Sequence, residues 1–226
     1  MTDASPNPFD RYIPDRTRVK ICGVRDIETA LVAAQAGADA IGFVFVDDSP
    51  RSITPDDAAD IMYQLPPLLS TVSVTRDLDL EAFSMIEQRC PTTISQLHGK
   101  ENESLCEQCG PGVIKGFRFE PATIESQLMR WEKVDEVDAV LIDGSDGGDG
   151  TPFDWNALND PARGFAKPIF LAGGLTPANV ADAIRAVRPF AVDVSSGVER
   201  EPGVKDHDLI AEFCAAVREA DASFPG

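Results

Sequence analysis

Two side chains at the ends of apolar segments are of types that could take part in catalysis. Cys22 closes residues 18–22 and precedes Gly23, a residue that permits the turn needed to leave a thiol at a strand's end. Asp143 closes the apolar run 140–142. A carboxyl whose pKa is raised by desolvation can donate a proton as a general acid. Taken alone, such a cysteine is usually core filler and such an aspartate is usually solvated, so the interpretation depends on the elements that position them.

The elements around this pair alternate between short β-branched runs and helix-length amphipathic segments. This alternation is typical of βα units and a parallel sheet. In the first run, Val19 and Ile21 alternate with polar residues, which predicts a half-buried strand. The predicted strands are residues 18–22, 39–46, 69–75, 93–97, 112–118, 137–142, 167–172 and 190–195.

Helix-start signals follow several of these strands. Asp26 is a candidate N-cap for a helix that ends before Gly37, and Asp206 for a terminal helix. Thr54-Pro55 and Thr176-Pro177 each place a capping hydroxyl before a proline.

Eight such units predict one domain, a single (β/α)8 TIM barrel of eight parallel strands over residues 18–226 with an outer ring of helices. Residues 1–17 are predicted to be a loosely ordered N-terminal extension. A doubly wound open sheet is the alternative, but residues 22–26 do not form the Gly-rich dinucleotide fingerprint that this fold usually carries.

Two glycine- and serine-containing loops follow the last two predicted strands, where TIM barrels most often hold phosphate. They contain Gly173 and Gly174, and Ser195, Ser196 and Gly197. Glycines let backbone N–H groups approach an anion, and the serine hydroxyls add donors. Plain turn glycines are the structural alternative for either loop alone, but two such loops on adjacent strands favour a phosphate site.

Arg51, beyond the second strand, has a planar guanidinium that suits a carboxylate or a phosphate. The alternative is a surface ion pair with the neighbouring Asp47 and Asp48. Residues 143–150, after the sixth strand, are rich in glycine and aspartate and are predicted to form a mobile loop.

A zinc site is an alternative that the spacing of the cysteines does not favour. Cys106 and Cys109 have C-x-x-C spacing, with Cys90 and His98 nearby in sequence. The histidine is predicted at the mouth of the barrel, whereas Cys106 and Cys109 are predicted on an outer helix, so the four residues do not form a tetrahedral set. We expect no metal.

The composition restricts the partners and the compartment. The 226 residues carry a formal net charge of −18, and the sequence contains no basic patch that could bind nucleic acid or an anionic membrane. Neither is therefore expected as a partner. Five cysteines without small-scaffold spacing suggest free thiols in a reducing cytoplasm. Since only six of the twenty basic residues are lysine, the surface resembles that of a salt-adapted, halophilic protein. An ordinary acidic protein is the alternative.

The chain resembles the phosphoribosylanthranilate isomerases of tryptophan biosynthesis from about Val19 to Val217. The matching segments are VKICG at 19–23, GADAIGFVF at 37–45, SPR at 49–51, QLHG at 96–99, ID at 142–143, GTPFDW at 150–155, AGGLTPANV at 172–180 and VDVSSGVE at 192–199, with PG at 202–203 and KD at 205–206. Any one of these motifs is weak, but together they are specific.

The resemblance implies a cofactor-free Amadori rearrangement of a phosphosugar substrate. Asp143 would be the general acid and Cys22 the general base, and Arg51 would face the anthranilate carboxylate. The loops at 173–174 and 195–197 would hold the phosphate. Asp193 would contact the sugar hydroxyls or orient its loop, and Gln96 and His98 would line the mouth.

The chain is expected to be a monomer or a homodimer. Two other functions are weaker alternatives. Indole-glycerol-phosphate synthase relies on lysines at the barrel mouth, whereas only Lys20 and Lys115 lie in predicted strands here. A non-catalytic phosphosugar-binding or regulatory barrel would keep the phosphate loops, but the presence of both Cys22 and Asp143 favours the enzyme.

Overall fold

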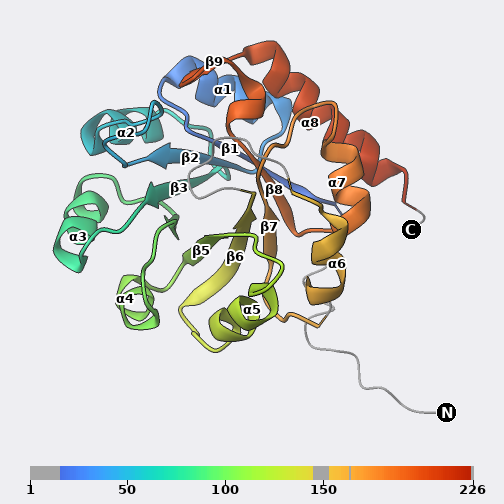
Figure 1. Ribbon diagram of the computed structural model, residues 1–226. Helices are drawn as coiled ribbons and strands as arrows, with labels where there is room; N and C mark the ends of the chain where they lie inside the picture. The colour runs from blue at the N-terminus through green and yellow to red at the C-terminus, as the bar shows by residue number, and fades with distance from the viewer. Residues whose placement is uncertain (1–15, 145–152, 163, 225–226) are drawn as a thin grey trace.

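The computed structural model is a closed barrel of parallel strands surrounded by helices (Figure 1), and it describes residues 16–144, 153–162 and 164–224. The strands pair in sequence order and β8 closes onto β1. The predicted TIM barrel is therefore confirmed, and the open sheet is excluded. The strands are β1 (Arg18–Cys22), β2 (Ala40–Val44), β3 (Ser70–Thr75), β4 (Ile94–Leu97), β5 (Val113–Arg118), β6 (Val137–Asp143), β7 (Ile169–Leu171) and β8 (Ala191–Val194).

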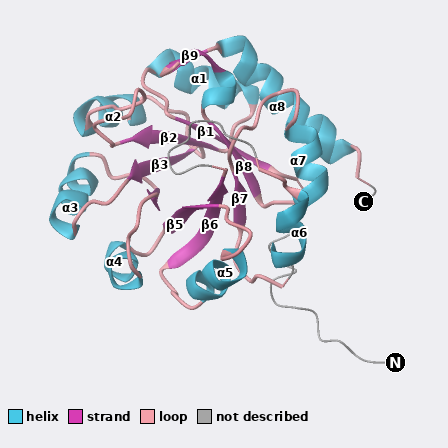
Figure 2. Ribbon diagram, viewed as in Figure 1, coloured by secondary structure: helices cyan, strands magenta, loops and turns pink. Residues whose placement is uncertain are grey.

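The helices form the outer ring of the barrel (Figure 2). They are α1 (Ile27–Ala36), α2 (Pro55–Met62), α3 (Leu80–Arg89), α4 (Glu103–Cys109), α5 (Ile124–Glu132), α6 (Asn156–Ala162), α7 (Val180–Val187) and α8 (His207–Ala222). Three predicted N-caps are confirmed, because the side chains of Asp26, Thr54 and Asp206 each accept a backbone N–H from the first turn. Gly37 ends α1 in the left-handed conformation with φ +97°.

The predicted cap at Thr176-Pro177 is wrong, because α7 begins only at Val180. Residues 177–179 form a turn instead. The Asn179 side chain accepts from the Thr176 N–H at 2.8 Å and donates to the Gly174 carbonyl at 2.8 Å. Through these bonds Asn179 holds the preceding glycine loop at the barrel mouth. The helix therefore begins about one turn later than predicted.

Most strands begin or end one or two residues from their predicted positions, and hydrogen bonding explains two of these differences. β7 begins at Ile169 rather than at residue 167, because Pro168 has no N–H to donate to the ladder, although its carbonyl accepts from Val140 N at 3.0 Å. β6 includes Asp143, whose carbonyl accepts from Phe119 N at 2.7 Å. The backbone of the predicted acid is therefore held within the sheet.

The prediction of a half-buried β1 is wrong, because the strand is buried on both faces. Val19 and Ile21 belong to the apolar layer between the sheet and the helices. Cys22 belongs to a separate apolar cluster with residues of β2 and β3, and Lys20, on the same face of the strand, is fully buried. The inner face accommodates the charged Lys20 because Asp193 of β8 forms an ion pair with it.

The last two residues before β1 are tied to the barrel. Arg16 forms an ion pair with Asp39, and Thr17 donates from its N–H and its hydroxyl to Asp221 of α8, at 2.7 Å each. Residues 1–15 lie outside the described part of the chain, so the extension predicted there stays a prediction. Within the described residues, each helix is too short or too polar to span a lipid bilayer.

Candidate active site

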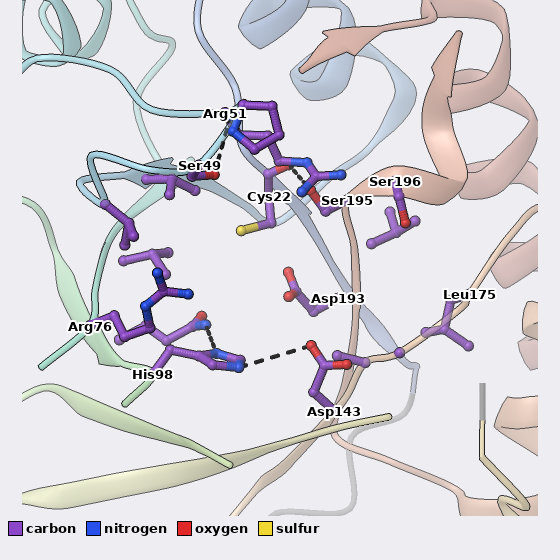
Figure 3. A pocket seen from close by; sticks show the side chains of 18 of the residues that line it. Cys22, Ser49, Arg51, Arg76, His98, Asp143, Leu175, Asp193, Ser195 and Ser196 are labelled. Atoms are coloured by element: carbon purple, nitrogen blue, oxygen red, sulfur yellow. Dashed lines mark hydrogen bonds and ion pairs between the residues drawn. The ribbon is translucent and has the colours of Figure 1, made fainter. Parts of the chain in front are cut away.

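The predicted site residues gather around one cavity at the carboxyl end of the barrel (Figure 3). Those that line it are Cys22, Arg51, Gln96, His98, Asp143, Gly173, Gly174, Asp193, Ser195 and Ser196. Gly197 is the exception: it does not line the cavity, and any side chain there would collide with the Leu175 carbonyl. Residues as far apart in sequence as Cys22 and Ser196 therefore converge because their strands all end at the same face.

Cys22 enters the cavity from the end of β1. Gly23 has φ +77°, as the expected turn requires, and a Cβ there would lie 2.7 Å from Cδ of Arg51. The Ser195 hydroxyl donates to the Cys22 carbonyl at 3.1 Å. Burial raises the pKa of the Cys22 thiol above its ordinary value, whereas Lys20 and Lys205 oppose that rise. The sulfur therefore depends on nearby cations to become a thiolate.

Asp143 reaches the cavity from the side opposite Cys22 (Figure 3). It is buried, and its Oδ2 lies 3.9 Å from Nε2 of His98. The Gln96 amide nitrogen donates to Nδ1 of His98 at 2.9 Å, which leaves the ring proton on Nε2. Burial, with a contribution from Lys115, lowers the pKa of His98 to about 4. His98 is therefore neutral near pH 7 and presents an N–H toward Asp143.

Arg51 is fixed by Glu199 rather than by the adjacent aspartates, so the alternative of a surface ion pair with Asp47 and Asp48 is excluded. Its Nε and one terminal nitrogen donate to the two oxygens of Glu199 at 2.8 and 2.9 Å. Burial lowers the pKa of Arg51, but the Glu199 carboxylate raises it by more than burial lowers it. The pKa of Arg51 therefore lies above its ordinary value. This bidentate pair holds a permanent cation at the cavity wall.

Glu199 and Lys205 lie in a two-stranded ribbon that follows the barrel, β9 (Glu199–Glu201) and β10 (Val204–Lys205). The Lys205 ammonium lies 2.8 Å from Glu199 and donates to the carbonyl oxygen of Ser195 at 2.9 Å. The ribbon therefore connects Arg51 to the serine loop. Burial lowers the pKa of Lys205, and Glu199 opposes that change.

The two glycine- and serine-containing loops lie next to one another, as expected for neighbouring strands. Gly173 and Gly174 have φ +89° and +65°, and a Cβ at Gly173 would lie 2.9 Å from Cα of Gly144. Ser196 begins a short 3-10 turn, η2 (Ser196–Val198). Glycine is required at Gly173 and Gly174 because other residues rarely adopt this backbone conformation.

A model of the N-(5'-phosphoribosyl)anthranilate (PRA) isomerase family matches residues 19–216, which is most of the chain. The chain belongs to the PRA isomerase family. The sequence-based prediction of an enzyme, an isomerase of tryptophan biosynthesis, is thereby confirmed.

Relatives in sequence and in structure agree with this membership. N-(5'-phosphoribosyl)anthranilate isomerase from Geotalea uraniireducens is 45% identical over 201 residues, which are 87% of this chain and 96% of that protein. The crystal structure of phosphoribosyl anthranilate isomerase from Thermotoga maritima superposes with a TM-score of 0.82 at 39% identity, covering 90% of this chain and 99% of that one. A second structure, of the isomerase in complex with reduced 1-(o-carboxyphenylamino)-1-deoxyribulose 5-phosphate, has a TM-score of 0.80 at 39% identity, with the same coverage of the two chains.

The cysteines that suggested a zinc site are buried thiols in this structure. All five cysteines of the chain are free and buried. Burial raises the pKa of Cys90, Cys106 and Cys109 to about 11, so these thiols are protonated near pH 7. In the described part of the chain, no three His, Cys, Asp or Glu side chains are grouped so that they could hold a metal ion.

The sequence interpretation did not assign four charged residues of the site, which are Lys20, Arg76, Glu199 and Lys205. Arg76 lines the cavity and pairs with Asp48 at 2.6 Å. Its position after β3 is the signal that could have selected it, since ligands meet strand ends in barrels. No local pattern joins Glu199 to Arg51, which precedes it by 148 residues.

Proposed function

We propose that Cys22 and Asp143 are the general base and the general acid of an Amadori rearrangement of N-(5'-phosphoribosyl)anthranilate. The observation that carries this proposal is that the two side chains line one cavity from opposite sides (Figure 3), with the glycine- and serine-containing loops at its edge. A substrate held by its phosphate at those loops would lie between an acid and a base.

The first step is opening of the ribose ring. The Asp143 carboxyl donates its proton to the furanose ring oxygen as the bond from that oxygen to C1' breaks. The anthranilate nitrogen supplies its electron pair to C1', giving a protonated Schiff base. The neutral His98 ring next to Asp143 supports this assignment, because it is not itself an acid near pH 7.

The second step is removal of the C2' proton by the Cys22 thiolate. The electrons of the C2'–H bond form a C1'–C2' double bond, and the C1'–N electrons return to nitrogen. The resulting enolamine tautomerises by losing the O2' proton and gaining a proton at C1'. The product is 1-(2-carboxyphenylamino)-1-deoxyribulose 5-phosphate, an isomer of the substrate, and no cofactor is required.

The remaining predicted residues bind the substrate in this proposal. Backbone N–H groups near Gly173, Gly174 and Gly197 and the hydroxyls of Ser195 and Ser196 hold the phosphate, an arrangement that suits a chain with net charge −18 because amides need no lysine.

Arg51 faces the anthranilate carboxylate, while Val44, Val46 and Val74 give that end of the cavity an apolar wall for the ring. Asp193 contacts the sugar hydroxyls, and Gln96 and His98 complete the mouth.

Several finer properties belong to the same proposal. The enzyme acts in the cytoplasm as a monomer or a homodimer, takes a small phosphosugar as its only partner in catalysis, and is adapted to high salt. Neither nucleic acid nor a membrane is a partner. The strong acidity of the chain supports both the adaptation to high salt and the exclusion of nucleic acid and membranes as partners.

A fluorescence assay of phosphoribosylanthranilate consumption at high salt tests the function. The purified chain should consume the substrate without any added cofactor. Cys22→Ala and Asp143→Ala should each lower turnover by about two to four orders of magnitude, the range of a lost general acid or base. Binding of the substrate without turnover by the unmodified chain would instead support a non-catalytic barrel.

A further inference from the structure

Lys20 is a charged residue inside the barrel that the proposed reaction leaves without a role. Its side chain is fully buried on the inner face of β1. Lys20 lies in register with Asp193 of β8, and its ammonium donates to Oδ1 of that residue at 2.7 Å. Asp193 lines the cavity, whereas Lys20 is not among the residues that line it.

The ammonium of Lys20 lies beside the sulfur of Cys22. The two residues are two positions apart on β1, so their side chains project from the same face of the strand. Gly42 of β2 is in register with Cys22 and leaves open space there. A Cβ on Gly42 would lie 3.0 Å from Sγ of Cys22 and 3.2 Å from Nζ of Lys20. One missing side chain therefore gives room to both groups.

Stability does not explain this buried pair. Removing two charges from water costs several kcal/mol per ion, and apolar replacements of such pairs are often as stable or more stable. Lys115, the other fully buried lysine of the barrel strands, shows what a structural lysine looks like: it donates to the carbonyls of Leu97, Gly99 and Gly116 and pairs with Glu101 at 3.0 Å. Lys20 instead lies between a carboxylate and a thiol.

The charges that face Cys22 come from four elements. They are Lys20 on β1, Asp193 on β8, Lys205 on β10 and Arg51 after β2. Burial raises the pKa of Cys22, and Asp193 adds to that rise, whereas Lys20 is the largest influence that lowers it. Burial would lower the pKa of Lys20, but Asp193 and Cys22 raise it above its ordinary value, so the ammonium keeps its charge.

We propose that Lys20 is a positioning residue for the reaction: its buried ammonium, anchored by Asp193, stabilises the Cys22 sulfur as a thiolate aimed into the cavity. This inference rests on the proposed role of Cys22 as the base. Lys20 keeps its proton throughout and does not contact the substrate.

Alkylation of Cys22 by iodoacetamide, followed as a function of pH in the absence of substrate, tests the inference. Mass spectrometry of the Cys22 peptide isolates this thiol from the four other cysteines. Lys20→Met should raise the pH at which alkylation reaches half of its maximal rate by at least about one unit, which is roughly a tenfold slower reaction near pH 7. Lys20→Arg, which keeps the charge, should stay closer to the unmodified protein.

Lys115→Met is the matched control, because it removes an equally buried lysine that pairs with Glu101 instead of Asp193. Its Cys22 alkylation profile should match that of the unmodified protein. If Lys20→Met is too unstable to fold, Lys20→Met with Asp193→Asn removes both buried charges. The half-maximal pH of this double variant should still lie above that of the unmodified protein.

An unchanged Cys22 profile in folded Lys20→Met would overturn the inference. An equal shift in Lys115→Met would also overturn it, because the effect would then belong to any buried lysine. Failure of the proposed function has a different signature: the unmodified chain would not consume phosphoribosylanthranilate, or Cys22→Ala would retain its turnover. The alkylation profile measured without substrate does not depend on either result.

Discussion

His98 is an ionisable residue of the cavity beside Cys22 and Asp143, the two that transfer protons in the proposed reaction. The imidazole lies 3.9 Å from Asp143 and accepts a hydrogen bond from Gln96 at Nδ1. Burial lowers its pKa to about 4, so the ring is uncharged throughout the range in which the proposed reaction requires Cys22 to ionise. His98 therefore provides a neutral N–H beside the acid without competing for its role.

The depressed pKa of His98 predicts a pH dependence of stability. In the unfolded chain His98 binds a proton near pH 6.5, whereas in the folded state it does so only near pH 4. The free energy of unfolding should therefore fall as the pH drops through this interval. Between pH 7 and pH 5 the loss assigned to His98 is about 2 kcal/mol. Urea unfolding of His98→Asn at both pH values should show a smaller loss than the unmodified chain. Equal losses in the two proteins would contradict the buried, neutral imidazole.

At the residue scale the sequence predicted the side chains at strand ends better than their partners. Cys22 and Asp143 could be found because each follows an apolar run. The side-chain alternation in β1 is as predicted, but both of its faces are buried. Because one face was expected to be solvated, Lys20 was not predicted to lie inside the barrel. Glu199 could not be found as the partner of Arg51, because that contact exists only after the barrel closes.

At the scale of elements, β5 has a glycine that makes room for His98. A Cβ on Gly116 would lie 2.5 Å from Nδ1 and 2.9 Å from Cγ of the ring. A rigid ring inside a closed barrel has little space to retreat, because interiors are close-packed. The β5 backbone and the His98 side chain are therefore coupled.

Gly116→Ala should destabilise the protein by about 1–3 kcal/mol through overpacking, and should lower kcat/KM by displacing His98. His98→Ala should relieve most of the stability cost when combined with Gly116→Ala. Free energies of unfolding for the two single variants and the double variant give the coupling energy. Additive costs would show that the methyl group added by Gly116→Ala collides with something other than the His98 ring.

The elements themselves followed local rules wherever local contacts decide them. Asp26, Thr54 and Asp206 cap helices as predicted, because each bond joins residues within one turn. The start of α7 departs from the prediction, since Asn179 is used to hold Gly174 at the barrel mouth. The loop predicted at residues 143–150 lies outside the described residues from position 145 onward.

At the scale of the whole molecule, eight βα units and the motifs spread along the chain predicted both the barrel and the family. The regular period of strands is a property of the full sequence, which is why the prediction of the fold was more complete than that of the ion pairs. The site then results from topology, because parallel strands bring their carboxyl ends to one face.

The net charge of −18 belongs to the same scale and predicts a dependence on salt. Repulsion among carboxylates destabilises the compact state at low ionic strength, and salt screens it. The midpoint of thermal unfolding should rise steadily from low to multimolar KCl. A midpoint that stays constant or falls over this range would show an ordinary acidic protein instead.

The division of labour between Asp143 and Cys22 is the central claim, and substrate deuterated at C2' tests it most directly. Single-turnover rates with deuterated and ordinary phosphoribosylanthranilate give the isotope effect in Cys22→Ser and in Asp143→Asn. Loss of the base should make C2' proton removal limiting and enlarge the isotope effect, whereas loss of the acid should make ring opening limiting and suppress it. Equal isotope effects in the two variants, or a near-normal rate in Cys22→Ser, would contradict the account.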